Sequence, residues 1–189
     1  MKTNCTLFVC LLLLAACSAS MAQTQTDPSD ESNPHKWVSY VSEAGKFKIK
    51  FPAKPTESSE VQEGEGGPSN VYLAEYKGLL LYVTTYGNSA SHITDAKLYL
   101  KNVGNAWLDA NSLHNIHVLK DEEISFKNNP GRFVVVETQM QVVRARWIVV
   151  GDRIYYQFVL APKRYNAPAS ENGYEKLATA FFDSFELTH

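Results

Sequence analysis

A two-residue turn between two long apolar runs limits the fold of this chain more than any other feature. Gly151-Asp152 separates residues 142–150 from residues 153–161, and both runs have the β-branched and aromatic composition of strands. A two-residue loop fixes the register of an antiparallel hairpin, because residues equally distant from the turn must face each other. The predicted pairs are Val150 with Arg153, Val149 with Ile154, Trp147 with Tyr156, Ala145 with Phe158 and Arg146 with Gln157.

The two faces of this hairpin differ in polarity, because side chains alternate across a strand. One face is apolar and aromatic, and we expect it to belong to the core: Ala145, Trp147, Val149, Ile154, Tyr156 and Phe158. The opposite face carries Arg144, Arg146, Tyr155 and Gln157 among Ile148 and Val159. Since that face is half polar, we expect it to be solvated or covered only in part.

The rest of residues 37–189 predicts a single α+β domain, an antiparallel sheet flanked by helices. The folded part is expected to begin at residues 37–41, and further strands are predicted at residues 46–51, 71–76, 79–86, 116–119, 124–126 and 132–138. A Gly-rich stretch at residues 57–70 predicts a loose hairpin tip or loop. Asn129-Pro130-Gly131 predicts a turn.

Two segments show an apolar stripe at helical spacing. Thr94 or Asp95 can cap the first helix, which runs to about Asn111. Gly104 lies inside this helix and costs ~1 kcal/mol relative to alanine. Ser170 can cap the second helix, whose stripe comprises Tyr174, Leu177, Ala178, Phe181 and Phe185.

Residues 1–16 have the features of a secretory signal peptide. Lys2 is their only charge, and the apolar run at residues 6–16 is shorter than the ~20 residues of a membrane-spanning helix. Leu14-Ala15-Ala16-Cys17 resembles the bacterial lipobox, in which the cysteine becomes the lipidated first residue of the mature protein. The alternative is cleavage after Ser20-Met21-Ala22, which would release a soluble periplasmic or secreted protein.

Residues 17–36 are rich in Ser, Gln, Asp and Pro without an apolar period, so we expect a flexible tether. Ser18 follows the cysteine where an aspartate would indicate retention at the inner membrane, so the lipobox implies an outer-membrane lipoprotein facing the periplasm. Cys5 and Cys10 leave with the signal. The domain then has no thiol, which excludes a disulfide scaffold, a cysteine nucleophile and a thiolate metal site.

The sequence has no catalytic motif such as a Gly-x-Ser-x-Gly elbow or a phosphate-binding glycine loop. His114 and His117 form a His-x-x-His pair, but two ligands rarely make a metal site, so we expect surface histidines. Asp121, Glu122 and Glu123 are expected in a solvated turn, because no geometry supports a catalytic role. No metal or cofactor is predicted.

The best candidate for a ligand site is formed by Arg144, Arg146 and Gln157. Two guanidinium groups on one sheet face could bind a carboxylate or a phosphate bidentately. In the alternative, structural interpretation, the arginines cover apolar surface with their stems and pair with Glu137 on the adjacent strand. We favour that interpretation, because arginine stems commonly lie along apolar surface.

Three segments together resemble the PsbP-like domains: residues 45–52 (GKFKIKFP), 146–155 (RWIVVGDRIY) and 181–185 (FFDSF). This family includes the extrinsic photosystem II subunit, a Ran-binding nuclear-import factor and many bacterial exported proteins of unknown role. The resemblance covers nearly all of residues 37–187. It implies an α/β/α arrangement around an antiparallel sheet, with a binding or assembly role in place of catalysis, and it carries over no metal- or partner-binding residue.

We therefore expect a non-enzymatic, lipid-anchored cell-envelope protein that binds or scaffolds an envelope protein partner. The alternative is a soluble periplasmic or secreted protein that binds a small anion through Arg144, Arg146 and Gln157. A hydrolytic enzyme ranks third. A net charge of −2 and a pI near 6.2 give no basic excess of the kind that nucleic-acid binding requires.

Overall fold

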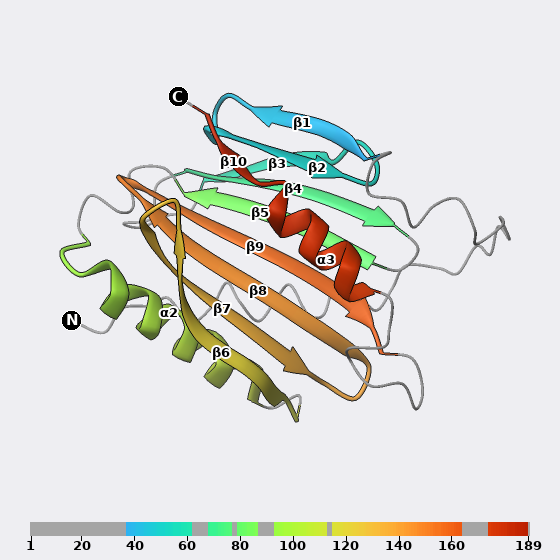
Figure 1. Cartoon of the computed structure of the whole chain (residues 1–189), viewed down its shortest axis with the longest axis vertical. Helices are drawn as coiled ribbons and strands as arrows, with labels where there is room; N and C mark the ends of the chain where they lie inside the picture. The colour runs from blue at the N-terminus through green and yellow to red at the C-terminus, as the bar shows by residue number, and fades with distance from the viewer. Residues whose placement is uncertain are drawn as a thin grey trace, which may run out of the picture.

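The computed structural model describes residues 37–61, 68–76, 79–86, 93–112, 115–163 and 174–188. The predicted signal, Cys17, the tether, His114 and Ser170 lie outside these residues. The strands and helices, labelled as in Figure 1, are β1 (Val38–Ser42), β2 (Phe47–Phe51), β3 (Thr56–Val61), β4 (Pro68–Tyr76), β5 (Leu79–Tyr86), α2 (Ala96–Asn111), β6 (His117–Phe126), β7 (Asn129–Glu137), β8 (Gln141–Val150), β9 (Arg153–Pro162), α3 (Tyr174–Asp183) and β10 (Glu186–Leu187).

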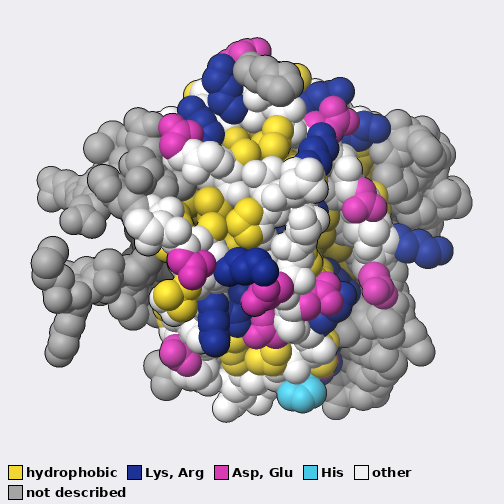
Figure 2. Space-filling model, turned by 60° about the vertical axis from the view of Figure 1, so that its left-hand side comes forward, with side chains coloured by type: hydrophobic (Ala, Val, Ile, Leu, Met, Phe, Trp, Pro, Cys, Tyr) yellow, Lys and Arg dark blue, Asp and Glu magenta, His cyan; other side chains and the backbone are white. Residues whose placement is uncertain are grey.

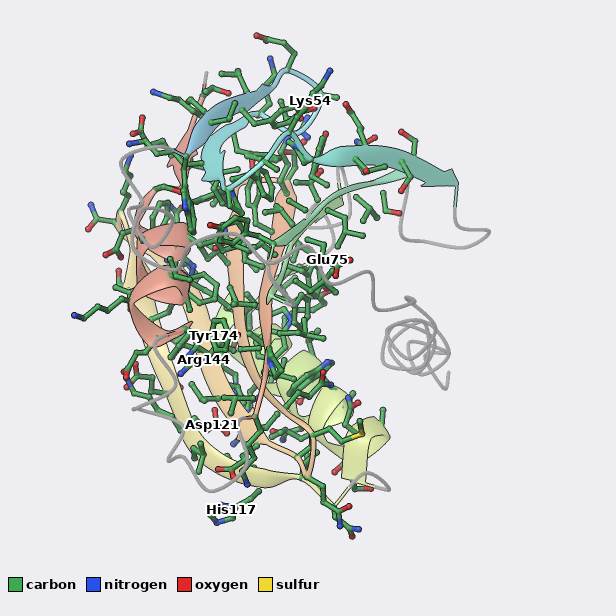
Figure 3. All side chains as sticks on the ribbon, turned by 90° about the vertical axis from the view of Figure 1, so that its right-hand side faces the viewer. Lys54, Glu75, His117, Asp121, Arg144 and Tyr174 are labelled. Carbon is green, nitrogen blue, oxygen red and sulfur yellow. The ribbon has the colours of Figure 1, made fainter. Side chains whose placement is uncertain are left out.

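The strands form two antiparallel sheets. The larger has seven strands in the order β3-β4-β5-β9-β8-β7-β6, and the smaller has three in the order β1-β2-β10. Helix α2 packs on β7 and β8, whereas α3 packs against β9 and β2. The two helices therefore lie on opposite faces of the large sheet (Figures 1 and 3), which we call the α2 face and the α3 face. This arrangement confirms the predicted α+β fold.

The predicted hairpin register is confirmed at every pair. Val150 faces Arg153, Trp147 faces Tyr156, and Arg146 faces Gln157. Gly151 has a φ of 56°, in the left-handed region that a two-residue hairpin turn requires and that glycine adopts without strain. The hairpin therefore places the predicted apolar set on the α2 face and the arginines on the α3 face.

The α2 face is buried as predicted. Asp95 caps α2 by accepting a hydrogen bond from the backbone N–H of Leu98 at 3.0 Å. The apolar stripe of the helix then buries Leu100 and Trp107 against the sheet. The ring of Trp107 meets that of Trp147 edge-on, with centroids 5.6 Å apart.

The α3 face is also buried, so the prediction that it is solvated or partly covered is wrong. Ile148 and Val159 are inaccessible to solvent on this face, and Tyr155 is only 1% exposed. The small sheet and α3 cover them with a second core, whose members include Phe47, Ile49, Phe51, Phe181, Phe182 and Phe185. A single hairpin cannot show this cover, because the covering residues come from both ends of the domain.

Three further boundaries differ from the sequence predictions. The loop predicted at residues 57–70 contains most of β3 and the start of β4, and β3 pairs with β4 along the whole of β3. Strand β3 is polar, and its pairing to β4 comes from main-chain hydrogen bonds that need no apolar pattern.

Helix α3 ends at Asp183, so Phe185 reaches the core from the segment after the helix.

The turn predicted at residues 129–131 lies earlier in the chain. Lys127 and Asn128 both have positive φ values, 48° and 68°, as in a two-residue hairpin turn. Pro130 is already in β7, opposite Ser125. Asparagine tolerates the left-handed region better than most residues, and this preference marks the true turn.

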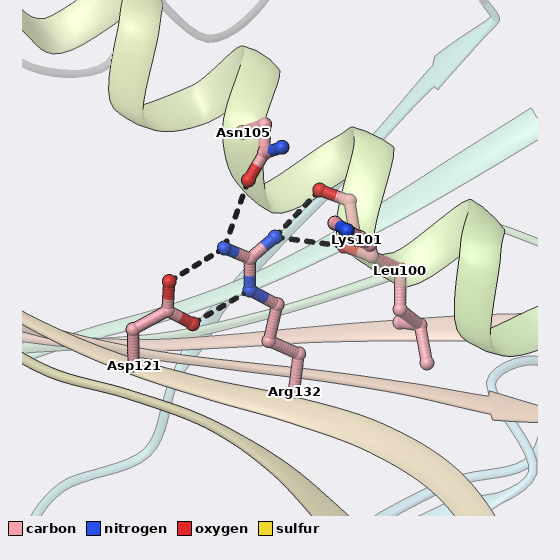
Figure 4. A network of polar contacts seen from close by, with 5 residues as sticks. All are labelled: Leu100, Lys101, Asn105, Asp121 and Arg132. Atoms are coloured by element: carbon pink, nitrogen blue, oxygen red, sulfur yellow. Dashed lines mark hydrogen bonds and ion pairs between the residues drawn. The ribbon is translucent and has the colours of Figure 1, made fainter.

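A polar network on the α2 face fixes the position of α2 (Figure 4). Arg132 of β7 donates to both carboxylate oxygens of Asp121, at 2.8 and 2.7 Å, in the bidentate geometry that suits a guanidinium. It also donates to the carbonyl oxygens of Leu100 and Lys101 and to Oδ1 of Asn105. Arg132 is only 7% exposed, so its charge is buried but fully partnered.

Gly104 allows this approach. A Cβ atom at residue 104 would lie 2.6 Å from Cζ of Arg132, inside van der Waals contact. The glycine that lowers the helix propensity of α2 is therefore the residue that lets the guanidinium reach the helix backbone.

Replacement of Gly104 by alanine should lower the free energy of unfolding by about 1–3 kcal/mol, because the displaced guanidinium outweighs the gain in helix propensity. Urea unfolding followed by circular dichroism measures this change. Asn102→Ala, at an exposed position of the same helix, should be neutral or slightly stabilising. A more stable Gly104→Ala protein would contradict the close contact.

The ion pair should also make stability depend on pH. The hydrogen bond from Arg132 holds the pKa of Asp121 below its usual value, although burial opposes this effect. A lowered pKa in the folded state stabilises the protein fully above the unfolded pKa of ~3.9, and the stabilisation is lost as the pH falls through the folded value.

Asp121→Asn should therefore differ most from the wild type in unfolding free energy at neutral pH, and the difference should shrink below about pH 4. Urea unfolding over this pH range is the measurement. Glu123→Gln is the control: its ion pair with Lys97 has side chains 73% exposed and should contribute below ~0.5 kcal/mol. A difference for Asp121→Asn that does not change with pH would count against the linkage.

Candidate functional site

The structure brings together the three residues predicted to bind a ligand. Arg146 of β8 lies directly opposite Gln157 of β9, and Arg144 lies two residues along β8 on the same α3 face. All three are buried: Arg144 is 7% exposed, Arg146 is 8% exposed and Gln157 is inaccessible. They therefore lie beneath the α3 layer and do not form an open surface.

Arg146 makes its contacts with groups of the protein itself. Its Nε donates to Oε1 of Gln157 at 2.6 Å, and its Nη2 donates to the carbonyl oxygen of Phe182 at 2.7 Å. The guanidinium also lies 5.0 Å from the ring centroid of Phe182, 5.4 Å from that of Phe126 and 5.8 Å from that of Phe185. These distances are those of cation–π contacts, which are stronger where water is excluded.

Burial lowers the pKa of Arg146 to about 10, and the charge of Asp183 partly opposes that shift. The guanidinium is therefore still protonated at neutral pH. Its charge is stabilised by two acceptors and by aromatic faces, so Arg146 acts as a structural tie between the sheet and α3. These contacts agree with a structural role for this residue, although its partners are Gln157 and Phe182 and not Glu137.

Arg144 differs from Arg146. Within the part of the chain that the structure describes, it has no hydrogen-bond or ion-pair partner. Burial lowers the pKa of its guanidinium, and the charge of Glu175 in the first turn of α3 opposes this shift. The predicted pairing of the arginines with Glu137 is wrong, because that carboxylate forms an ion pair with Lys163.

Gln157 has one satisfied and one unsatisfied end. Its Oε1 accepts from Arg146, whereas its Nε2 is buried and has no hydrogen-bond partner among the described residues. An unpaired buried amide is uncommon in native proteins and is destabilising. Gln157 therefore orients Arg146. The buried amide Nε2 without a partner lowers the stability of the fold, and this loss accompanies the bond to Arg146.

The acidic run and the histidine pair do not form a site. Asp121, Glu122 and Glu123 lie in β6, not in the predicted turn, and each has a basic partner: Arg132, Lys120 and Lys97 respectively. His117 is exposed at the start of β6, and His114 lies outside the described residues. Among the described residues, no group of three His, Cys, Asp or Glu side chains could hold a metal ion.

A second polar cluster, which the sequence did not indicate, joins the small sheet to the large one. The hydroxyls of Ser42 and Tyr72 are hydrogen-bonded at 2.5 Å, and Ser42 also accepts from the backbone N–H of Gly45 at 2.8 Å. Tyr155 donates to the carbonyl oxygen of Gly45 at 3.0 Å. These contacts link residues far apart in the chain, so no local pattern marks them.

The tyrosines of this cluster are held in the neutral form. Burial raises the pKa of Tyr155 to about 12 and also raises the pKa of Tyr72. Neither phenol is a proton acceptor at neutral pH. Their hydroxyl groups are hydrogen-bonded inside the fold, so the cluster serves packing and not proton transfer.

The exposed surface carries charges of both signs. Figure 2 shows basic and acidic side chains interspersed over the face of the molecule that it presents. On β6, Lys120 pairs with Glu122 at 2.8 Å, and Glu123 pairs with Lys97 at 3.5 Å. In the described part of the chain, no helix is long and apolar enough to cross a membrane.

No family model matches this chain, and a search of curated proteins finds no match either. Solved structures do match. Cyanobacterial PsbP (CyanoP) from Synechocystis covers 88% of this chain and 98% of its own, with a TM-score of 0.54 and 10% sequence identity. The Ran-binding protein Mog1p of Saccharomyces cerevisiae covers 80% of this chain and 95% of its own, with a TM-score of 0.49 and 12% identity.

The described residues thus form an α+β sandwich of two antiparallel sheets and two helices. More narrowly, its fold is the PsbP-like fold, as the sequence resemblance implies. At 10% identity this likeness shows the fold alone, and it assigns no role to any residue.

The structural role of Arg146 can be tested by Arg146→Met, which keeps the volume and removes the donors. We expect the free energy of unfolding to fall by about 1–3 kcal/mol, because buried acceptors on Gln157 and Phe182 lose their partner. Urea unfolding is the measurement. Arg153→Met is the control, since Arg153 makes an exposed hydrogen bond to the carbonyl of Ala44 and should matter little. Unchanged stability of Arg146→Met would refute the tie.

Proposed function

We propose that this protein is a non-enzymatic, lipid-anchored cell-envelope protein with a binding or scaffolding role. The observation that carries the proposal is Leu14-Ala15-Ala16-Cys17 at the end of a short apolar run. Acylation at Cys17 attaches several acyl chains, and each buried methylene contributes about 0.8 kcal/mol to membrane binding. The anchor is then stable, at the outer membrane and facing the periplasm.

The tether length supports this arrangement. Residues 17–36 would span roughly 25 Å as a flexible coil. That distance holds a folded domain just clear of a membrane surface and leaves it free to meet an envelope protein partner. The mixed surface charges favour a protein partner over a nucleic acid, whose binding requires a basic face.

The chemistry of the described residues supports binding over catalysis. Two groups with shifted pKa values, Arg146 and Tyr155, are buried and hydrogen-bonded within the fold. Functional sites instead place shifted groups in a cleft, where a substrate can reach them. These shifts therefore reflect packing.

A second function is favoured by one observation: Arg144 is 7% exposed, and its guanidinium has no hydrogen-bond partner among the described residues. It fits the alternative of a soluble periplasmic or secreted protein, cleaved after Ala22, that binds a small anion. The two proposals differ at residue 17, because only the first needs a lipidated cysteine.

The anchor is tested by labelling cells with an alkyne fatty acid and comparing the wild type with Cys17→Ala. We expect the wild type to carry label and to fractionate with the outer membrane, whereas Cys17→Ala loses the label and becomes soluble. Cys10→Ala, a matched change inside the apolar run, should keep the label. Equal labelling of the wild type and Cys17→Ala would overturn the proposal.

The same cells test the binding role. An envelope protein should co-purify with both the wild type and Cys17→Ala from detergent extracts, because the folded domain is the same in each. Recovery of the domain alone from both extracts would contradict a scaffolding function.

A further inference from the structure

In the described part of the chain the two sheets have four edge strands, and three of them are protected against pairing with another chain. The edges are β3 and β6 of the large sheet and β1 and β10 of the small one. Strand β6 carries four consecutive charged residues, 120–123, and its register shifts between Val118 and Lys120. Strand β3 is polar and carries Glu57, and β10 has only two residues. Charges, bulges and short length are the means by which natural sheets prevent edge-to-edge contact.

Strand β1 (Val38–Ser42) has none of these protections except modest length. Its sequence, Val-Ser-Tyr-Val-Ser, includes no charge and no proline, and every residue pairs with β2 in an unbroken register. Strand β2 is the only one that pairs with β1 among the described residues, so the peptide groups on the far side of β1 have no strand to bond. Val38 is 49% exposed and Val41 is 47% exposed. An uncharged, regular edge with exposed valines is suited to the addition of another strand.

Strand β1 lies at the outside of the domain. Figure 1 shows it at the end of the molecule opposite α2 and β6. Tyr40 fixes one face of the strand to the core, because its ring contacts those of Phe51 and Tyr72 and its hydroxyl donates to Glu57 at 2.7 Å. These contacts use side chains, so they hold β1 in place without using the peptide groups of its outer edge.

The sequence of β1 is suited to pairing with a second copy of itself. In an antiparallel pair with a two-fold axis at Tyr40, each Ser39 faces Val41 of the other copy, and each Val38 faces Ser42 of the other copy. Every valine then meets a small serine, and no pair brings like charges together. The pairing joins two three-stranded sheets into one continuous sheet.

The position of the tether favours a second copy over a different protein. Only Trp37 separates β1 from residues 17–36. Under the proposed anchor, every copy presents this edge within the same ~25 Å of one membrane, and this confinement raises the local concentration of copies. In the pair the two Val38 residues are four positions apart along the strands, or ~14 Å, so both tethers can reach one bilayer.

We propose that this protein forms a symmetric homodimer through antiparallel pairing of β1 with β1 of a second copy. The dimer deepens the scaffolding role proposed above, and it rests on the proposed anchor only for the local concentration of copies. A contact between two five-residue strands is smaller than the ~1,200 Å² of most stable complexes. The dimer therefore dissociates in dilute solution and forms where the anchor gathers the protein.

Sedimentation equilibrium of the Cys17→Ala chain tests self-association without a membrane. We expect a reversible monomer–dimer equilibrium with a dissociation constant between about 1 µM and 1 mM, the range of a weak interface. No species larger than the dimer should form, because the two-fold pairing of β1 uses the free edge of both copies.

The double variant Ser39→Glu/Val41→Glu separates pairing from folding. Within one copy the new acids face Lys50 and Lys48 of β2, so we expect an unchanged melting temperature of the monomer. Across the dimer the acids face each other, and self-association should weaken at least about tenfold. Leu119→Glu is the control: it places an acid at an exposed apolar residue of the other long edge, β6, and should dimerise as the wild type does.

Cysteine cross-linking tests the register of the pair. Residues 18–189 contain no cysteine, so an introduced thiol has no competitor in the mature Cys17→Ala chain. One tagged copy carries Ser39→Cys and a differently tagged copy carries Val41→Cys. Opposite residues of paired strands have Cα atoms ~4.5–5.5 Å apart, within the range of a disulfide, so mild oxidation should join the two tags. Ser125→Cys in both copies, at an exposed residue of β6, should give no cross-link.

Three results would overturn the dimer. One is a wild-type chain that stays monomeric at about 1 mM, which would leave the edge to a different protein or to none. Another is equal self-association of the double variant and the wild type. The third is cross-linking of residues 39 and 41 no faster than that of the control pair at residue 125. A chain that dimerises in solution yet carries no acyl label would refute the anchor and leave the dimer, so the two proposals fail separately.

Discussion

The guanidinium of Arg146 connects three elements that apolar packing alone would leave free to slide. It joins β8 to β9 through Gln157 and joins both to α3 through the carbonyl oxygen of Phe182. Hydrophobic burial has no direction, so it holds a helix against a sheet without fixing its position along the sheet. The last carbonyls of a helix lack partners within it and carry partial negative charge. An arginine at this end therefore supplies hydrogen-bond donors to the carbonyls and a positive charge that the helix dipole favours.

A sheet arginine also donates to helix carbonyls on the α2 face. There Arg132 extends from β7 to the backbone carbonyls of Leu100 and Lys101, and Gly104 removes the side chain that would block it. Each covering helix is thus joined to the central sheet by one sheet arginine that donates to helix carbonyls. Arg144, on the α3 face of β8, has no such bond to a helix carbonyl among the described residues.

Local patterns predicted the parts of the fold that local chemistry controls. The turn at Gly151-Asp152 fixed the register, and Asp95 marked the start of α2, since each acts within a few residues of itself. The cover of the α3 face could not be predicted, because it joins β2 to α3 across most of the domain. The arginine face was correctly located, yet the bond of Arg146 to the carbonyl oxygen of Phe182 could not be predicted, because it depends on where α3 lies on the sheet.

The small sheet has a consequence for how this domain is made. Its strands β1 and β2 come from the beginning of the folded region, and β10 comes from the end, where the N–H of Thr188 donates to the carbonyl of Lys46 at 3.0 Å. The first apolar strand to leave the ribosome therefore stays incomplete until the last residues follow it. Contacts of such wide separation close slowly. Until then Phe47 lacks its contact with Phe185 and Phe51 lacks its contact with Phe181, so a chain interrupted near its end leaves the ribosome with this core incomplete.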